Sequence, residues 1–468
     1  MILRTEGRHA RSVRVPASAE HAQVTRALAR GGVAMLANSG LTAFLGVVFW
    51  LVAARILTAA AVGRGSALVA ALWTVSGLCQ LNYARSLSGL MPLAAHPRRL
   101  LARVYGLTGA FSVAVGLASA CILPLSVSSF HYLRGNALFV ISFALSVALW
   151  TVFTLEDTAL TSVRRATILP FENGAYGLLK IICLLGLWAV GYRTSVALFI
   201  AWALPLVAVV IPVNLFLFFR AIPVSAGQPG TREARAQPWV HYDFAGYLLW
   251  LAGTLPLPVL VLISVGPAKA AAFYIPFTVA GAIDLLSLNL GNSLTAELSR
   301  SHGVMTAAAR SYLQRVWVTI GVLSALLYLM APYVLQAFGD QYRAEGTVIL
   351  QMFMVATLPR SVLYLGIAIQ RSRGNGKPIL LLQAISSLGT LTLGFALAHS
   401  LGALGMALGW LIASCLAALA TALLLRTGTR RGRRYPGGEE RVRGGQRTAG
   451  LHRRPVPAGR SDGTRRSD

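Results

Sequence analysis

Ionisable side chains inside the long apolar segments are the residues of this sequence best suited to chemistry. The densest group lies between residues 150 and 180 and comprises Glu156, Asp157, Glu172 and Lys180, with Asn173 beside them. An ionisable group inside hydrocarbon costs at least about 2.5 kcal/mol, so its presence there points to a function. Carboxyl groups can bind a proton or a metal cation, and an ammonium group can bind an anion.

Lys180 lies near the middle of its apolar segment, too far from either end to reach water easily. Asn173 precedes it by seven residues, and residues with this spacing share one face of an α-helix. We therefore expect Asn173 and Lys180 to point together toward the interior of the protein. Two interpretations of Lys180 stay open: it binds an anionic group, or it pairs with Glu172 or Asp157.

Arg85, Arg360 and Asp284 are the other ionisable residues expected within apolar segments. Arg85 is expected in the second segment, where it either extends to the membrane interface or contacts an anionic substrate such as a phosphate. Asp284 is a candidate for cation coupling. The predicted substrate-binding cations are Arg85, Lys180 and Arg360. The predicted gating or coupling residues are Glu156, Asp157, Glu172, Asn173 and Asp284.

The sequence contains no motif typical of an enzyme or of a bound cofactor. Walker, dinucleotide-binding and zinc-ligand spacings are absent. The four cysteines (Cys79, Cys121, Cys183 and Cys415) fall inside apolar segments, and we expect small buried side chains rather than metal ligands or disulfides. We therefore predict no catalytic residues, no metal site and no cofactor, and a protein that is not an enzyme.

The elements that position these residues follow from composition. Of 468 residues, 56% are hydrophobic and 12% are charged, whereas soluble proteins carry about 25% charged residues. Apolar runs of about 20 residues, the length that crosses a bilayer, recur along the chain. We predict an all-α polytopic membrane protein with about twelve transmembrane helices. They cover residues 32–54, 66–91, 104–126, 137–160, 168–190, 195–219, 243–265, 270–293, 312–335, 347–370, 378–399 and 402–425.

The longest internal connection, residues 220–242, is rich in Gly, Pro, Arg and Gln and separates two sets of six segments. This predicts a basic N-terminal tail (1–29), a six-helix bundle (30–219), a cytoplasmic linker (220–242), a second six-helix bundle (243–426) and a disordered basic tail (427–468). Two such bundles are typical of a transporter whose pathway runs between them. The GxxxG motif at Gly405 and Gly409 predicts close packing of two helices.

The basic residues behave as orientation signals rather than as a nucleic-acid site. The net charge is +27, but most of the 42 Lys and Arg residues lie in the tails and in alternate loops. The positive-inside rule then places both termini in the cytoplasm. The opposite loops hold only Arg55, Arg64, Arg134, Arg193, Lys269 and Arg343. We expect a multi-pass protein of a bacterial plasma membrane, in contact with membrane lipids and without a nucleic-acid partner.

Several segments resemble polysaccharide-export flippases of the multidrug/oligosaccharidyl-lipid/polysaccharide (MOP) superfamily, of the type found in high-GC bacteria. The first helix pair carries the turn formed by Ala54–Leu57 and Val62–Gly63, and LNYARSLSGLMPLA follows at 81–94. Further similar segments are residues 155–173 with Lys180, and residues 272–281, 292–298 and 338–350. The resemblance implies a MATE/MOP-like fold of two six-helix bundles around a central cavity, and alternating access.

The resemblance also implies transport of a lipid-linked oligosaccharide, or a related cell-envelope polysaccharide precursor, from the inner to the outer leaflet. The implied partners are this lipid-linked glycan, a coupling cation (sodium or proton) and glycan-synthesis enzymes. Two alternatives stay open. One is a cation-coupled multidrug exporter, and the other is a non-transporting membrane scaffold for envelope glycan synthesis.

Overall fold

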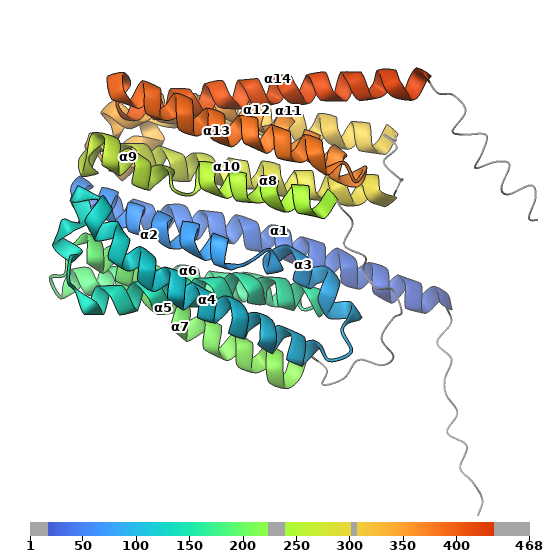
Figure 1. Cartoon of the computed structure of the whole chain (residues 1–468), viewed down its shortest axis with the longest axis horizontal. Helices are drawn as coiled ribbons and strands as arrows, with labels where there is room; N and C mark the ends of the chain where they lie inside the picture. Colours follow the sequence, from blue (N-terminus) through green and yellow to red (C-terminus); the bar gives the residue numbers. More distant parts are fainter. Residues whose placement is uncertain (1–16, 223–238, 301–306, 435–468) are drawn as a thin grey trace, which may run out of the picture.

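The computed structural model describes residues 17–222, 239–300 and 307–434 (Figure 1). Within these ranges all regular secondary structure is helical, and twelve helices are long and apolar enough to cross a membrane. The predicted fold class and number of spans are therefore confirmed. Figure 1 shows the two halves of the chain as two bundles, with the start of α1 and the end of α14 at the same end of the molecule.

The first half forms one bundle. Its helices are α1 (Ala17–Ile56), α2 (Ala59–Cys79), α3 (Tyr83–Leu90), α4 (Pro97–Ser126), α5 (Ala137–Ser162), α6 (Leu169–Ala189) and α7 (Ser195–Phe216). Short 3₁₀ turns (η1 Met91–Leu93, η2 Ser128–Leu133, η3 Ala166–Ile168) join some of them, and a π-helical turn, η4 (Leu217–Ala221), extends α7. Within the bundle α1 packs on α6, α4 on α5, and α6 on α7.

The second half forms the other bundle. Its helices are α8 (Trp239–Thr254), α9 (Leu257–Val265), α10 (Pro267–Arg300), α11 (Ala307–Phe338), α12 (Asp340–Ser372), α13 (Gly376–Leu401) and α14 (Ala403–Arg434). α8 and α9 together make one span. α13 packs on α8 and α14, and α12 packs on α10, α11 and α14. Most of the predicted linker, residues 223–238, lies outside the described residues.

The bundles meet closely at the end of the molecule where α1 terminates, which we call the Arg55 end. Arg55 donates hydrogen bonds from Nε and Nη2 to the carbonyls of Ala337 (2.6 Å) and Gln336 (3.0 Å) at the end of α11. On α2, a Cβ at Gly63 would overlap the carbonyl of Pro267 at the start of α10. Glycine therefore permits backbone contact between the two bundles here.

The second predicted span is wrong in its boundaries, and Arg85 does not lie inside it. The span is α2, Ala59–Cys79, whereas residues 66–91 were expected. After α2 the backbone turns through Leu81 (φ 47°) and Asn82 (φ 67°), both left-handed, before α3 begins. Side chains rarely adopt this conformation, which breaks the helix. The sequence does not mark this break clearly, because α3 still carries Ala84, Leu87 and Leu90 among its polar residues.

The last two helices confirm the packing expected from the GxxxG motif. A Cβ on Gly405 would overlap the carbonyl group of Leu397 in α13, and a Cβ on Gly409 would overlap the backbone of Gly394. The small residues therefore allow the backbones of α13 and α14 to touch.

α14 continues to Arg434, and α1 already begins at Ala17, so helix extends into both segments predicted as tails. Residues 1–16 and 435–468 lie outside the described residues.

Candidate functional site: a central aromatic cavity

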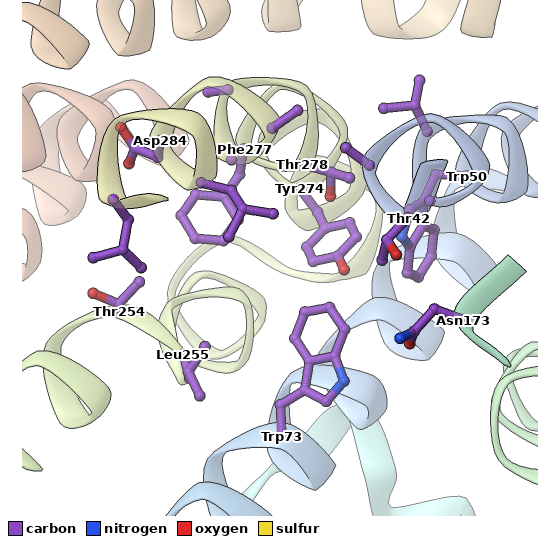
Figure 2. Close-up of a pocket in the computed structure, with 18 of the residues that line it drawn as sticks. Thr42, Trp50, Trp73, Asn173, Thr254, Leu255, Tyr274, Phe277, Thr278 and Asp284 are labelled. Atoms are coloured by element: carbon purple, nitrogen blue, oxygen red, sulfur yellow. The ribbon is translucent and has the colours of Figure 1, made fainter. Parts of the chain in front are cut away.

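A cavity of about 510 Å³ lies between the two bundles. Side chains from α1, α2, α5, α6 and α7 line it on one side, and side chains from α8, α10, α12 and α14 on the other. Its walls include six of the nine tryptophans: Trp50, Trp73, Trp150, Trp202, Trp250 and Trp410. Figure 2 shows the rings of Trp73, Tyr274 and Phe277 facing one space, with Asn173 on one side and Asp284 on the other.

Aromatic rings pack against one another in the walls of this cavity, both within the first bundle and across the two bundles. Trp50 of α1 packs edge-on against Tyr274 of α10, with ring centroids 4.6 Å apart, and against Phe49 at 5.2 Å. Trp202 of α7 lies 5.7 Å from Trp50. Aromatic pairs at these separations contribute about 0.5–1.5 kcal/mol each beyond the area that they bury. The cavity therefore has rigid, largely apolar walls.

Lys180 projects from α6 into this cavity, together with Asn173, as their spacing predicts. The side chain is only 4% exposed. Its Nζ atom lies 3.8 Å from the ring centroid of Trp202 and 5.2 Å from the rings of Phe49 and Tyr176. Desolvated cation–π contacts of this kind are worth about 2 kcal/mol.

No carboxylate in the described part of the chain forms an ion pair with Lys180. The expected alternative, a pair with Glu172 or Asp157, is therefore not formed in this structure. A buried cation held only by aromatic rings keeps its charge available to a ligand, because ring faces attract a cation without neutralising it. An anionic group in the cavity would supply the missing negative charge.

Arg360 of α12 also lines the cavity, but its charge is already balanced. Its Nε lies 2.8 Å from Oδ2 of Asp284 in α10, and its Nη2 donates a 2.6 Å hydrogen bond to the hydroxyl of Tyr364. The guanidinium also stacks 4.0 Å from the ring of Trp410. Arg360 and Asp284 thus form a buried ion pair within the second bundle. The second bundle therefore presents a neutral pair to the cavity, whereas the first bundle presents the ammonium group of Lys180 and the carboxyl group of Asp157.

A buried acidic cluster lies beside the cavity in the first bundle. Glu156 and Asp157 come from α5, and Glu172 and Asn173 come from the first turns of α6. Asn173 donates a 3.4 Å hydrogen bond to Asp157. Asn214 of α7 donates to Glu156, and the carboxyl group of Glu172 lies near that of Glu156. The structure thus brings four of the predicted coupling residues together.

The members of this cluster differ in their access to the cavity. Asp157 and Asn173 line it, whereas Glu156 is fully buried behind them. Both carboxyl oxygens of Glu172 are buried and receive no hydrogen bond from the described residues. Buried carboxyl oxygens without donors are costly, so a proton or a cation would stabilise the cluster. Among the described residues no group of three or more potential ligands has the geometry of a metal site.

Arg85 is not among the residues that line the cavity. On α3, its Nη1 lies 3.3 Å from Oδ2 of Asp243 in α8, and its guanidinium lies 4.3 Å from the ring of Tyr247. Asp243 also accepts from Nε of Arg371 in α12, at 2.9 Å. One carboxylate of the second bundle therefore holds an arginine from each bundle. We call this contact the Arg85 bridge. The role predicted for Arg85 as a substrate contact stays a prediction.

Sequence reasoning missed the partners of Arg85 and the aromatic walls of the cavity. Asp243 and Arg371 lie at the ends of predicted spans, where charged residues usually face water, and nothing local distinguishes them. The tryptophans recur within the apolar segments, and this pattern could have indicated an aromatic cavity. The expectation of buried cysteines is met by Cys79 but is wrong for Cys121 and Cys415, which lie exposed on helix surfaces. Such surfaces face lipid in a membrane protein, where a thiol is tolerated as a small apolar group.

No protein-family model matches the sequence, and no curated protein sequence is significantly similar to it. Solved structures are similar in fold. An inward-facing multidrug resistance MATE family transporter of the MOP superfamily aligns with a TM-score of 0.60 at 16% identity, over 88% of this chain and 100% of that one. A MATE transporter of Vibrio cholerae aligns with a TM-score of 0.55 at 15% identity, over 88% and 98%.

A third structure is a MOP superfamily transporter from Pyrococcus furiosus, described as having a binding pocket of reverse polarity that suggests a different function. It aligns with a TM-score of 0.50 at 14% identity, over 86% of this chain and 95% of that one. Identities this low establish the fold and not the substrate. With its twelve candidate spans in two bundles, this chain has the fold of the MOP superfamily transporters and is similar to MATE structures.

Proposed function

We propose that this protein moves an anionic lipid-linked oligosaccharide, or a related cell-envelope polysaccharide precursor, from the inner to the outer leaflet of the plasma membrane by alternating access. The observation that carries the proposal is the ammonium group of Lys180. It lies buried in the central cavity among Trp202, Phe49 and Tyr176, with no carboxylate partner in the described chain. A phosphate or an acidic sugar would neutralise it.

The walls of the cavity fit the rest of such a head group. A volume of about 510 Å³ lies within the range of small-molecule pockets, roughly 300–1,000 Å³. Flat indole and phenol rings offer apolar surface to the faces of sugar rings, and Asn173, Thr278 and Tyr364 offer hydrogen-bonding groups. A charged head group could not cross hydrocarbon unaided, because desolvating it without partners costs several kcal/mol or more. Polar and aromatic groups of the cavity would take the place of the water molecules that hydrate the head group.

The acidic cluster is our candidate for the coupling site. Two ionised carboxylates as close as Glu156 and Glu172 repel one another, so a bound proton or sodium ion would stabilise the pair. Asp157 and Asn173 would connect this pair to the cavity, since both line it. Asp284 is engaged by Arg360 and would take part in coupling only if that ion pair opened.

A cation-coupled multidrug exporter is the alternative that a specific observation favours. Solved structures of similar fold include multidrug resistance transporters of the MATE family, and an aromatic cavity suits apolar drugs. However, a cationic drug in this cavity would lie near the ammonium group of Lys180, and like charges in a buried site repel strongly. The unpaired ammonium group of Lys180 therefore favours an anionic substrate. The scaffold hypothesis depends on the C-terminal tail, of which residues 435–468 lie outside the described residues.

The test is translocation of a labelled lipid-linked oligosaccharide by the full chain in proteoliposomes. We would compare Lys180→Met, which removes the charge, with Lys180→Arg, which retains it. Lys269→Met is the matched control, because Lys269 is an exposed lysine outside the cavity. A hydrogen bond to a charged group is worth about 1.5–3 kcal/mol, so the rate should fall roughly 10- to 150-fold in Lys180→Met.

Three outcomes separate the hypotheses. Loss of translocation in Lys180→Met, partial activity in Lys180→Arg and normal activity in Lys269→Met would support the flippase. Unchanged translocation in Lys180→Met would refute the role of Lys180. Folded protein that moves no glycan lipid but extrudes a cationic dye would replace this proposal with the multidrug exporter.

A further inference from the structure

A second hollow lies on the outer surface of the first bundle, separate from the central cavity. It has a volume of about 660 Å³ and is lined by α4, α5, α7 and η4. We call it the α4–α7 groove; its lining residues are Arg98, Val152, Val210, Ile211, Asn214, Leu215, Phe218 and Phe219. It shares no lining residue with the central cavity. All of its lining residues except Arg98 and Asn214 are apolar.

The shape of the groove follows from local helix geometry. α4 and α7 both pack against α5, whose Val152 contributes to the floor. α7 contains Pro212 and ends in the π-helical turn Leu217–Ala221, where the backbone widens. The rim is strongly exposed: Ile211 and Leu215 are each 53% exposed, and Phe219 is 73% exposed. An apolar rim of this kind is stable beside hydrocarbon and unfavourable beside water.

Arg98 fixes one end of the groove. Its Nε donates a 2.7 Å hydrogen bond to the carbonyl of Ile222, which holds the guanidinium at the end of η4. Arg99 and Arg103 follow on α4, and Arg220 lies in η4; these three are exposed. In the described part of the chain none of the four arginines forms an ion pair with a carboxylate. The end of an apolar groove therefore carries a concentrated, unneutralised positive charge.

We propose that the α4–α7 groove binds an anionic phospholipid of the surrounding membrane, with an acyl chain along the groove and the phosphate at Arg98. The arginine end is the same end of the bundle as α3, which the distribution of charge predicts to be cytoplasmic. Anionic lipids are concentrated in that leaflet, and each basic residue near it contributes about 1 kcal/mol of attraction. Apolar rim and basic end thus match the two parts of one lipid molecule.

The occupant is a resident lipid rather than the carrier lipid of a transported glycan. A carrier lipid with its head group in the central cavity would need to lie beside that cavity, and the groove and the cavity have no lining residue in common. The floor of the groove does touch the acidic cluster, because Asn214 lines the groove and donates to Glu156. A bound acyl chain would therefore exclude water from the outer side of that contact.

The test is lipid binding by the purified full-length protein, measured by native mass spectrometry with phosphatidylglycerol and phosphatidylcholine of identical acyl chains. Arg98→Gln removes the charge at the groove end, and Leu215→Trp fills the groove at an exposed position. The matched controls are Arg134→Gln, an exposed arginine at the opposite end of the bundle, and Ile182→Trp, an exposed apolar residue of α6. This readout does not depend on transport.

We expect the wild type to prefer phosphatidylglycerol by about fivefold or more, which corresponds to one basic contact. Arg98→Gln should abolish that preference, Leu215→Trp should weaken binding of both lipids, and the controls should bind as the wild type does. Equal binding of the two lipids by the wild type would overturn the proposal, as would unchanged binding in Leu215→Trp. Displacement of phosphatidylglycerol from the groove by a polyprenyl phosphate would identify the carrier lipid as the occupant and would also overturn it. If Arg98→Gln does not fold, Leu215→Trp against Ile182→Trp decides.

Discussion

The Arg85 bridge should control how the two bundles separate at the end where α3 lies. Asp243 binds Arg85 of the first bundle at 3.3 Å and Arg371 of its own bundle at 2.9 Å. Arg85→Gln therefore removes an ionic contact between the bundles, whereas Arg371→Gln removes a contact of the same type to the same carboxylate within one bundle. The second variant is a matched control. We predict that only Arg85→Gln shifts the protein toward a state open at this end.

The magnitude follows from exposure and geometry. The side chain of Arg85 is 39% exposed, so its ion pair with Asp243 is worth about 0.2–1 kcal/mol, as for a surface pair. The stacking of Arg85 on Tyr247 adds about 0.5–1 kcal/mol. Loss of both should change the equilibrium between the closed and open states by about 0.7–2 kcal/mol, or roughly 3- to 30-fold. High salt should produce part of this change in the wild type, because the pair is accessible to ions.

The assay is the distance between two spin labels, one on each bundle, measured by pulsed electron paramagnetic resonance. Suitable positions are the exposed Arg165 and Lys377, after the exposed Cys121 and Cys415 have been changed to serine. Arg85→Gln should increase the population with the longer distance, and Arg371→Gln should leave the distribution unchanged. Equal shifts in both variants, or none in either, would refute the reasoning that the contact between bundles controls the opening.

Two further predictions concern the buried charges. Asp284→Asn should lower the free energy of unfolding by about 3 kcal/mol, because it leaves Arg360 buried without its partner, and adding Arg360→Met should restore much of the loss. Thermal unfolding in detergent measures the stability of both variants. Equal stability of the wild type and Asp284→Asn would contradict this prediction. Glu172→Gln should make transport insensitive to a proton or sodium gradient without reducing the amount of folded protein, since it removes an ionisable group from the acidic cluster. The measurement is transport flux in the presence and in the absence of the ion gradient, with Glu345→Gln, at an exposed position, as the control variant. If Glu172→Gln still responds to the gradient, the prediction is wrong.

The spans were predictable from sequence because membrane insertion depends on the hydrophobicity of each segment by itself. A run of about 20 apolar residues crosses the bilayer whatever its neighbours are, so twelve spans followed from local composition. The shared face of Asn173 and Lys180 and the close approach at Gly405 and Gly409 were also predictable, since they depend on helical periodicity and residue size. The break after α2 was not, because the left-handed conformation of Leu81 is not marked by composition.

The partners of the charged residues were decided by the tertiary structure. Sequence reasoning gave Arg85, Lys180 and Arg360 the same predicted role as substrate-binding cations, because each is a basic residue expected within an apolar segment. The fold brings Asp284 from α10 to Arg360 and Asp243 from α8 to Arg85, across 76 and 158 residues of sequence. Among the described residues it gives Lys180 aromatic rings and no carboxylate partner. Whether a buried charge is free to bind a substrate depends on which helices pack together, and that arrangement is long-range, so the local pattern of residues does not contain it.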